Sequence, residues 1–138
     1  MRLRLALPLS VPALLGLCAC RPPPEPATRD VVIWRPVGSW SGHGHKQTET
    51  FTSDTGGFRV HWSTTLETTP GAGALRVTFR SGDSGREIMD AVNVRGVGEG
   101  AEEVAAERPR WYYLTIESAN VDWTVQVDER IDARFTRP

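Results

Sequence analysis

The sequence predicts an all-β fold, an antiparallel β-sandwich or jelly-roll-like domain of about seven to eight short strands. Two observations carry this prediction. Several segments alternate apolar and polar residues with a period of two, which is typical of half-buried strands. Gly-, Ser- and Asn-rich turns such as "SDTGG", "SGDSG" and "RGVGEG" separate them at short intervals. We place this domain at residues 30–130.

Four segments alternate clearly: 57–65, 74–81, 112–118 and 121–129. In each, the apolar members share one face, which predicts that face to be buried. The predicted inward residues are Phe58, Val60, Trp62, Leu75, Val77, Phe79, Tyr112, Leu114, Ile116, Val121, Trp123, Val125 and Val127.

Weaker strand signals occur at 31–34, 47–52 and 90–94. The stretch "AEEVAAE", 101–107, is rich in helix formers but lies between Gly100 and Pro109. It has room for one or two helical turns at most. The sequence leaves open whether it forms a short helix or a short edge strand.

The first residues differ in kind from this domain. "MRLR" is basic, and residues 5–17 carry no charge. A basic start, a short apolar stretch and small residues are typical of a signal peptide, here residues 1–19. The apolar stretch is shorter than the ~20 residues that a spanning helix needs.

Both cysteines lie at the end of this stretch, in "LGLCAC", which resembles the lipobox of bacterial lipoproteins. Two registers compete. Cys18 would have Leu17 where a small residue is expected, whereas Cys20 is preceded by Leu17, Cys18 and Ala19, which fits better. The resemblance implies that Cys20 is the lipidated first residue of the mature protein, and that acyl chains on Cys20 bind the membrane.

Residues 20–29 follow as a Pro-rich linker, "CRPPPEPATR". At ~3.1 Å per residue in an extended polyproline conformation, nine residues span about 28 Å. Arg21, in place of an Asp after the cysteine, implies by resemblance to lipoprotein sorting signals an outer-membrane location where the cell has one. Residues 131–138 are expected to be a C-terminal tail.

The domain itself resembles small secreted β-sandwich domains that are common in bacterial lipoproteins, many without an assigned function. The segments that carry this resemblance are "GSWSGHGHKQTETF", "FRVHW", "YYLTIES" and "DWTVQV", within residues 38–128. They are structural patterns, and they imply a displayed module in the cell envelope.

The three histidines of the chain are the first candidates for chemistry. His43 and His45 would share a face if their segment were a strand, and His61 would be needed as a third metal ligand. Gly42 and Gly44 flank His43, and no acidic residue lies within three positions of the pair. We therefore expect a solvated loop and no metal or other cofactor.

Two further patterns resemble catalytic or metal sites only in part. "GDSG" places Ser84 where chymotrypsin-like proteases have their nucleophile, but Arg86 follows and a hairpin turn explains the motif. Asp54, Asp83, Glu87 and Asp90 lie in or near turns, without the spacing of a calcium loop. We expect all of them to be solvated turn residues.

Aromatic residues give the better hint of binding. Trp111 and Tyr113 are predicted on the face opposite Leu114, and Trp40 lies in a Gly- and Ser-rich segment. Exposed aromatic rings can stack on sugar rings or peptides. The alternative is that Trp111 covers the end of the sandwich and Trp40 fixes its loop.

The sequence thus predicts a lipid-anchored envelope protein that displays a binding or structural module, with an envelope protein or a glycan as partner. With a net charge of −1, no basic surface favours nucleic acid. No nucleophile motif, metal cluster or cofactor loop indicates an enzyme. The alternative is a small metal-dependent or hydrolytic envelope enzyme that uses His43, His45 and His61.

Overall fold

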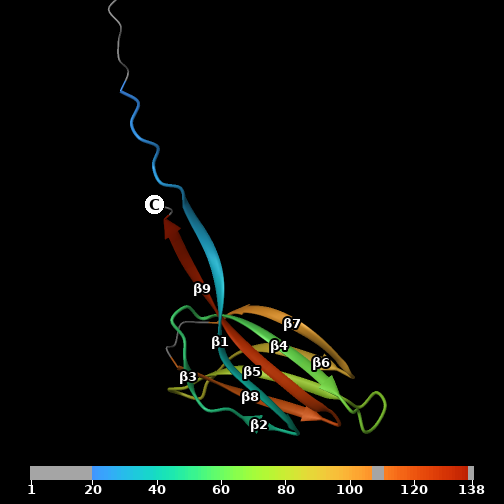
Figure 1. Cartoon of the computed structure of the whole chain (residues 1–138). Coiled ribbons are helices and arrows are strands. Elements are labelled where there is room, and N and C mark those ends of the chain that lie inside the picture. Colours follow the sequence, from blue (N-terminus) through green and yellow to red (C-terminus); the bar gives the residue numbers. More distant parts are fainter. Residues whose placement is uncertain (1–19, 107–110, 137–138) are drawn as a thin grey trace, which may run out of the picture.

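A computed structural model describes residues 20–106 and 111–136 (Figure 1). The expected signal peptide, residues 1–19, lies outside the described residues. Nine strands are present: β1 Thr28–His43, β2 Lys46–Gln47, β3 Phe51–Thr52, β4 Gly57–Thr65, β5 Ala74–Ser81, β6 Glu87–Arg95, β7 Gly98–Ala105, β8 Trp111–Ala119 and β9 Asp122–Thr136. Within the described ranges, no helix is long and apolar enough to cross a membrane.

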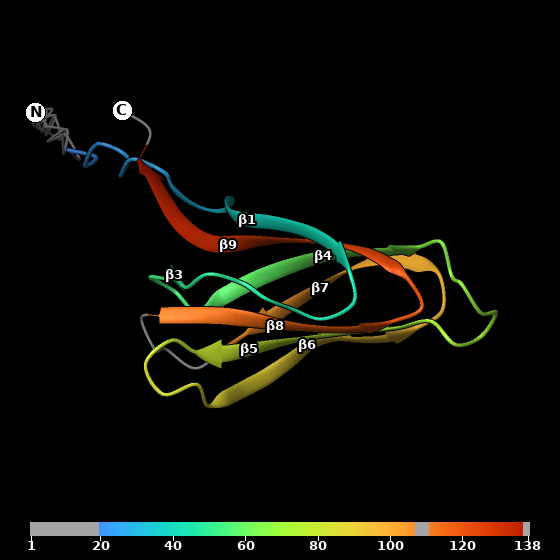
Figure 2. The same ribbon diagram turned by 90° about the horizontal axis from the view of Figure 1, so that it is seen from below.

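The strands form two sheets that face each other, which confirms the predicted β-sandwich (Figures 1 and 2). One sheet has the order β1-β9-β4-β7, and the other has the order β2-β8-β5-β6, with β3 also paired to β8. All pairings are antiparallel. β5 and β6 are neighbours in the sheet and are joined by a short turn. β9 lies inside its sheet, between β1 and β4.

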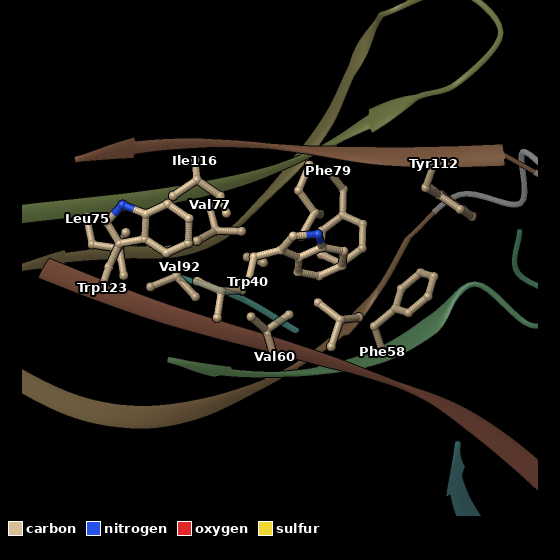
Figure 3. Close-up of a cluster of buried hydrophobic side chains, with 14 residues drawn as sticks. Trp40, Phe58, Val60, Leu75, Val77, Phe79, Val92, Tyr112, Ile116 and Trp123 are labelled. Carbon is tan, nitrogen blue, oxygen red and sulfur yellow. The ribbon is translucent and has the colours of Figure 1, made fainter. Parts of the chain in front are cut away.

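The core lies between the sheets, and the predicted alternation decides which side chains enter it (Figure 3). Every predicted inward residue is buried except Trp62, which is partly buried against the core. Phe58 and Phe79 stack across the two sheets with ring centroids 4.8 Å apart, and Tyr112 meets Phe58 edge-on at 5.3 Å. Large rings thus fill the centre of the sandwich.

Residues 101–105 form part of the edge strand β7 and not a helix, so the second of the two alternatives is correct. β7 pairs with β4 from Gly98↔Thr64 to Ala105↔Gly57. Gly100 lies directly opposite Trp62, and a Cβ at Gly100 would come within 2.9 Å of the indole ring. The pairing and this close approach outweigh the helix propensity of Ala and Glu, which is a weak local preference.

The expected strand 47–52 is interrupted. β2 and β3 each have two residues, and both pair with β8. Between them the Thr48 hydroxyl accepts from the N–H of Leu114 at 3.0 Å, and the N–H of Thr48 donates to the carbonyl of Leu114 at 3.0 Å. A side-chain hydroxyl that replaces a backbone partner breaks the ladder at this point.

Two strands continue well beyond the sandwich. β1 and β9 remain paired from Arg35↔Glu129 to Thr28↔Thr136, and form a two-stranded ribbon that projects from one end (Figures 1 and 2). Residues 28–29 and 131–136 are therefore strand residues, although the sequence placed them in the linker and the tail. Residues 20–27 continue outward from this ribbon, away from the sandwich (Figure 1).

Candidate functional site

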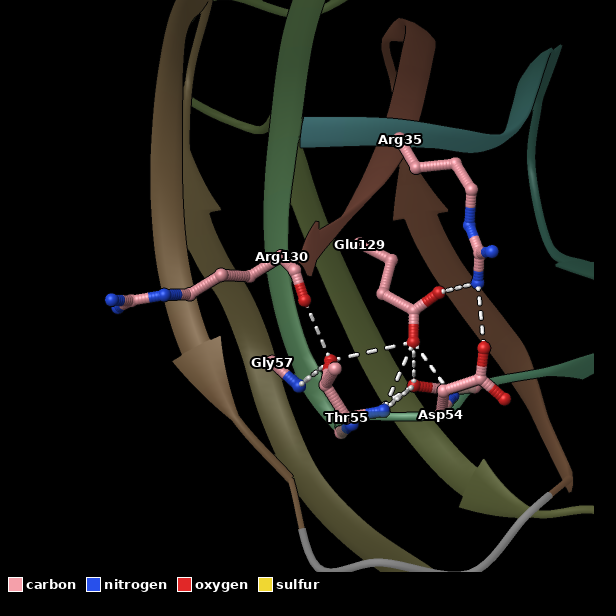
Figure 4. A network of polar contacts seen from close by, with 8 residues as sticks. Arg35, Asp54, Thr55, Gly57, Glu129 and Arg130 are labelled. Atoms are coloured by element: carbon pink, nitrogen blue, oxygen red, sulfur yellow. Dashed lines mark hydrogen bonds and ion pairs between the residues drawn. The ribbon is translucent and has the colours of Figure 1, made fainter. Parts of the chain in front are cut away.

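A buried carboxylate marks the point where the ribbon leaves the sandwich (Figure 4). Glu129 is fully buried, and its Oε1 accepts from the Ser53 hydroxyl at 2.5 Å and from the N–H groups of Asp54 and Thr55 at 2.7 and 3.1 Å. The Thr55 hydroxyl lies 3.3 Å from the same oxygen. Arg35 donates to the other oxygen, Oε2, and also to Asp54 at 3.3 Å.

These contacts set the ionisation of Glu129. Burial alone raises the pKa of a carboxyl group, but the hydrogen bonds from Ser53, Arg35 and the two backbone N–H groups act in the opposite direction and prevail. The pKa of Glu129 therefore lies below its ordinary value. Because both oxygens are already occupied by donors, this carboxylate is suited to fixing the loop 53–56 to β9 rather than to proton transfer.

A groove of about 590 Å³ opens beside this cluster. Its lining includes the charged residues Arg35, Asp54 and Glu129 and the apolar residues Pro36, Val37, Phe51 and Trp111. The side chains of Arg35 and Asp54 are 52% and 78% exposed, so both can contact a ligand. The groove thus combines an aromatic ring with a half-exposed guanidinium and a carboxylate.

The candidate aromatics are separated by the fold. Trp111 is 47% exposed and lines the groove, at the start of β8, with its Cβ packed where a side chain at Gly82 would lie. Tyr113 is half-buried on the same face of β8, and its hydroxyl reaches the β5–β6 turn near Gly85. Tyr113 does not line the groove.

Trp40 is not available to a ligand, which corrects the expectation drawn from its Gly- and Ser-rich segment. It is only 8% exposed and belongs to the core, and its indole N–H donates to Glu49 at 3.2 Å. Gly38, two positions earlier, gives the ring its space: a Cβ there would lie 2.5 Å from the indole. Gly38, two residues before Trp40 in the same strand, was the sequence signal that could have indicated a buried indole ring.

The three histidines do not come together. His43 ends β1 and its Nδ1 lies 2.8 Å from the Asp122 carboxylate, whereas His61 lies in the middle of β4, 3.3 Å from Asp128. Because Asp122 pairs with Thr65, His43 and His61 are separated by four residues, about 13 Å, along the strands alone. His45 is exposed and borders a different hollow, next to Glu117 and Ser118.

The other two patterns also take structural roles. Ser84 lies in the β5–β6 turn, where its hydroxyl accepts from the N–H of Arg86 at 3.3 Å, and Gly85 adopts a φ of 72°. Glu87 and Asp90 both pair with Arg76 on the outer face of the second sheet, far along the chain from Asp54 in the groove. Within residues 20–106 and 111–136, no three His, Cys, Asp or Glu side chains are placed to hold a metal ion.

The sequence reasoning missed Glu129 and Arg35. Glu129 has the same phase as Trp123, Val125 and Val127, so the alternation of β9 directs it inward. A charged residue in phase with a buried apolar face was the signal that could have found it, because such a residue needs dedicated partners.

Comparisons with known proteins identify no relative of this chain. No protein-family model matches the chain, and no curated protein is similar to it.

Proposed function

We propose that this chain is a lipid-anchored protein of the cell envelope, and that its β-sandwich is a binding module with the groove at Trp111 as its site. The proposed lipid anchor is supported by the position of Cys20. It is exposed and lies in segment 20–27, which leads outward from the ribbon (Figure 1). A lipid attached there would leave the sandwich and its groove accessible, because both lie beyond the ribbon.

The groove supports a ligand with a flat face and polar groups around it. Trp111 offers the ring, while Arg35 and Asp54, which line the same groove, offer a donor and an acceptor. A glycan of the envelope has this chemistry, since the C–H face of a sugar packs on an indole and its hydroxyls both donate and accept. Glu129 holds Arg35 in place by accepting its hydrogen bond.

Anchoring is tested by changing the two cysteines separately. Cys20→Ala should abolish labelling of the chain by radioactive palmitate and should leave an unprocessed or soluble protein, because no acceptor thiol remains at that position. Cys18→Ala is the matched control and should remain labelled and membrane-bound. Acyl groups found on Cys18 by mass spectrometry, or a Cys20→Ala chain that is still labelled by palmitate, would contradict the proposal.

Binding is tested with envelope extract that includes glycans. We expect Trp111→Ala to reduce the retained glycan at least tenfold relative to the parent chain, which corresponds to about 1.4 kcal/mol. Val97→Ala removes an exposed apolar side chain away from the groove and is the matched control. Equal retention by the parent chain and Trp111→Ala would show that the groove is not the binding site.

A further inference from the structure

Among the described residues, both edges of the ribbon are open: the outer edge of β1, and the edge of β9 that β4 covers only inside the sandwich. β4 pairs with β9 only from Thr65↔Asp122 to Phe58↔Glu129. Beyond Glu129, no strand of the described residues covers this edge of β9, so the backbone groups of residues 131–136 face solvent on that side. An open edge is a template for another strand, and an isolated two-stranded ribbon is only marginally stable in water.

The outer edges of the sandwich itself carry features that discourage pairing. β7 has Glu99, Glu102 and Glu103 at its edge, and β1 has Pro36, which lacks an N–H donor. Residues 131–136, "IDARFT", contain no proline, and their two charges have opposite signs. This edge of β9 therefore carries neither of the features that discourage pairing at β7 and at Pro36.

Along β9, apolar and charged side chains lie on opposite faces of the ribbon, whereas on β1 Val32 and Trp34 share the face of Asp132 and Arg130. Ile131, Ala133 and Phe135 alternate with Asp132 and Arg134 along β9. Val31 and Ile33 of β1 lie opposite Ala133 and Ile131, and they extend the apolar face. Phe135 is 55% exposed, Ile33 is 43% exposed and Val31 is 40% exposed, so this face is open to solvent.

We propose that the open edge of β9 pairs with the same edge of a second copy of this chain, antiparallel and centred on Ala133. Two identical antiparallel strands must be related by a two-fold axis through a residue, because paired residues share the same face and the same hydrogen-bonding direction. With the axis at Ala133, Asp132 lies opposite Arg134 of the second copy, and Ile131 lies opposite its Phe135. Each contact occurs twice.

Neighbouring registers are unfavourable. An axis at Asp132 would place the two Asp132 carboxylates opposite each other and would pair Arg130 with Arg134. An axis at Arg134 would place two guanidinium groups face to face. Pairing of the β1 edges about Val32 would likewise oppose Arg29 and Arg35. Like charges directly opposite each other are destabilising, so these registers are less favourable than the one centred on Ala133.

The pairing joins the two ribbons into a four-stranded sheet in the order β1-β9-β9-β1. Within each copy, Arg134 already contacts Asp30 at 3.2 Å and Arg130 contacts Asp132 at 3.1 Å. These pairs are largely exposed and contribute little, so Asp132 and Arg134 can exchange partners without disturbing the fold. The proposal does not depend on lipid anchoring or on the groove.

The register is tested by disulfide formation in the full chain, in cells treated with a mild oxidant. Ala133→Cys places two thiols directly across the two-fold axis, with Cβ atoms about 4.5–5.5 Å apart, and should give a covalent dimer on a non-reducing gel. Thr136→Cys is the matched control. Its thiols would be separated by six residues along the strands, about 20 Å, and should not cross-link. The parent chain controls for Cys18 and Cys20.

Charge exchange tests the ion pairs in the Ala133→Cys background. Arg134→Asp alone and Asp132→Arg alone should each reduce the cross-linked fraction to that of Thr136→Cys. The double change Asp132→Arg with Arg134→Asp should restore it, as should co-production of the two single variants. The proposal is overturned if Ala133→Cys cross-links no better than Thr136→Cys, if the single charge changes have no effect, or if the double change fails to restore the dimer.

Discussion

β1 and β9 run through both the sandwich and the ribbon, yet their side chains have very different surroundings in the two regions. Inside the sandwich, β1 and β9 bury Trp40, Trp123 and Val125 against the second sheet. In the ribbon, the same alternation leaves Ile33 and Phe135 half exposed, because no second sheet lies over them. Alternation therefore specifies a strand with one apolar face, but burial of that face depends on what the rest of the chain places against it.

Glu129 lies at the boundary between these two regions. On one side of it β9 pairs with both β1 and β4, and on the other side with β1 alone. The carboxylate gathers Ser53, Thr55 and Arg35 and closes the end of the sandwich with polar contacts. The comparison can be tested by substitutions in the sandwich, at this boundary and in the ribbon.

The largest effect is expected in the sandwich. Trp123 is 2% exposed, and its indole N–H donates to the carbonyl of Gly44 at 2.9 Å. Trp123→Ala should lower the free energy of unfolding by about 3–5 kcal/mol, since it leaves a large cavity and an unsatisfied carbonyl. Urea denaturation measures the loss. A loss below about 1 kcal/mol would show that the ring is not part of the tightly packed core.

An intermediate effect is expected at the boundary. Glu129→Gln keeps the shape of the side chain but removes its charge, and should cost about 1.5–3 kcal/mol near neutral pH, the contribution of hydrogen bonds to a charged group. Urea denaturation of the variant and the parent chain at the same pH gives this difference. A variant as stable as the parent would show that the charge of Glu129 is not needed to hold the loop 53–56.

The cost of Glu129→Gln should depend on pH in a defined direction. Because the pKa of Glu129 is lowered in the folded chain, its carboxylate stabilises the fold fully above the unfolded-state pKa of about 4.3. This contribution disappears as the pH falls through the lower folded-state pKa. The difference in unfolding free energy between the parent and Glu129→Gln should therefore shrink on acidification, and a difference that grows would reverse the assigned direction.

The smallest effect is expected in the ribbon. Phe135→Ala removes a ring that is 55% exposed and lies outside the sandwich. It should change the unfolding free energy of the dilute chain by no more than about 0.5 kcal/mol. The same urea titration that is used for Trp123→Ala provides the measurement. A loss as large as that of Trp123→Ala would mean that the ribbon is packed against part of the same chain, and the contrast between the two regions would fail.

Much of the fold could be predicted because the relevant signals are local. The side chains of Phe79, Leu114 and Val125 face inward as the period of two requires, and "GDSG" forms the expected turn. The candidate site was only partly predictable. Trp111 was identified from its phase on β8, but its neighbours Arg35 and Asp54 come from separate segments. Pairing of β3 with β8 brings Thr52 opposite Trp111, and pairing of β1 with β9 brings Arg35 opposite Glu129.

The sequence by itself determined the all-β class, the faces of the clear strands and the turns, because these depend on neighbours within a few residues. Tertiary structure decided what depends on distant partners. Residues 101–105 became a strand because β4 pairs with them, and Trp40 became buried because Gly38 leaves room for its ring. Residues 131–136 became strand because β1 runs beside them, and Glu129 remained charged inside the protein because four donor residues from β1 and the loop 53–55 converge on it.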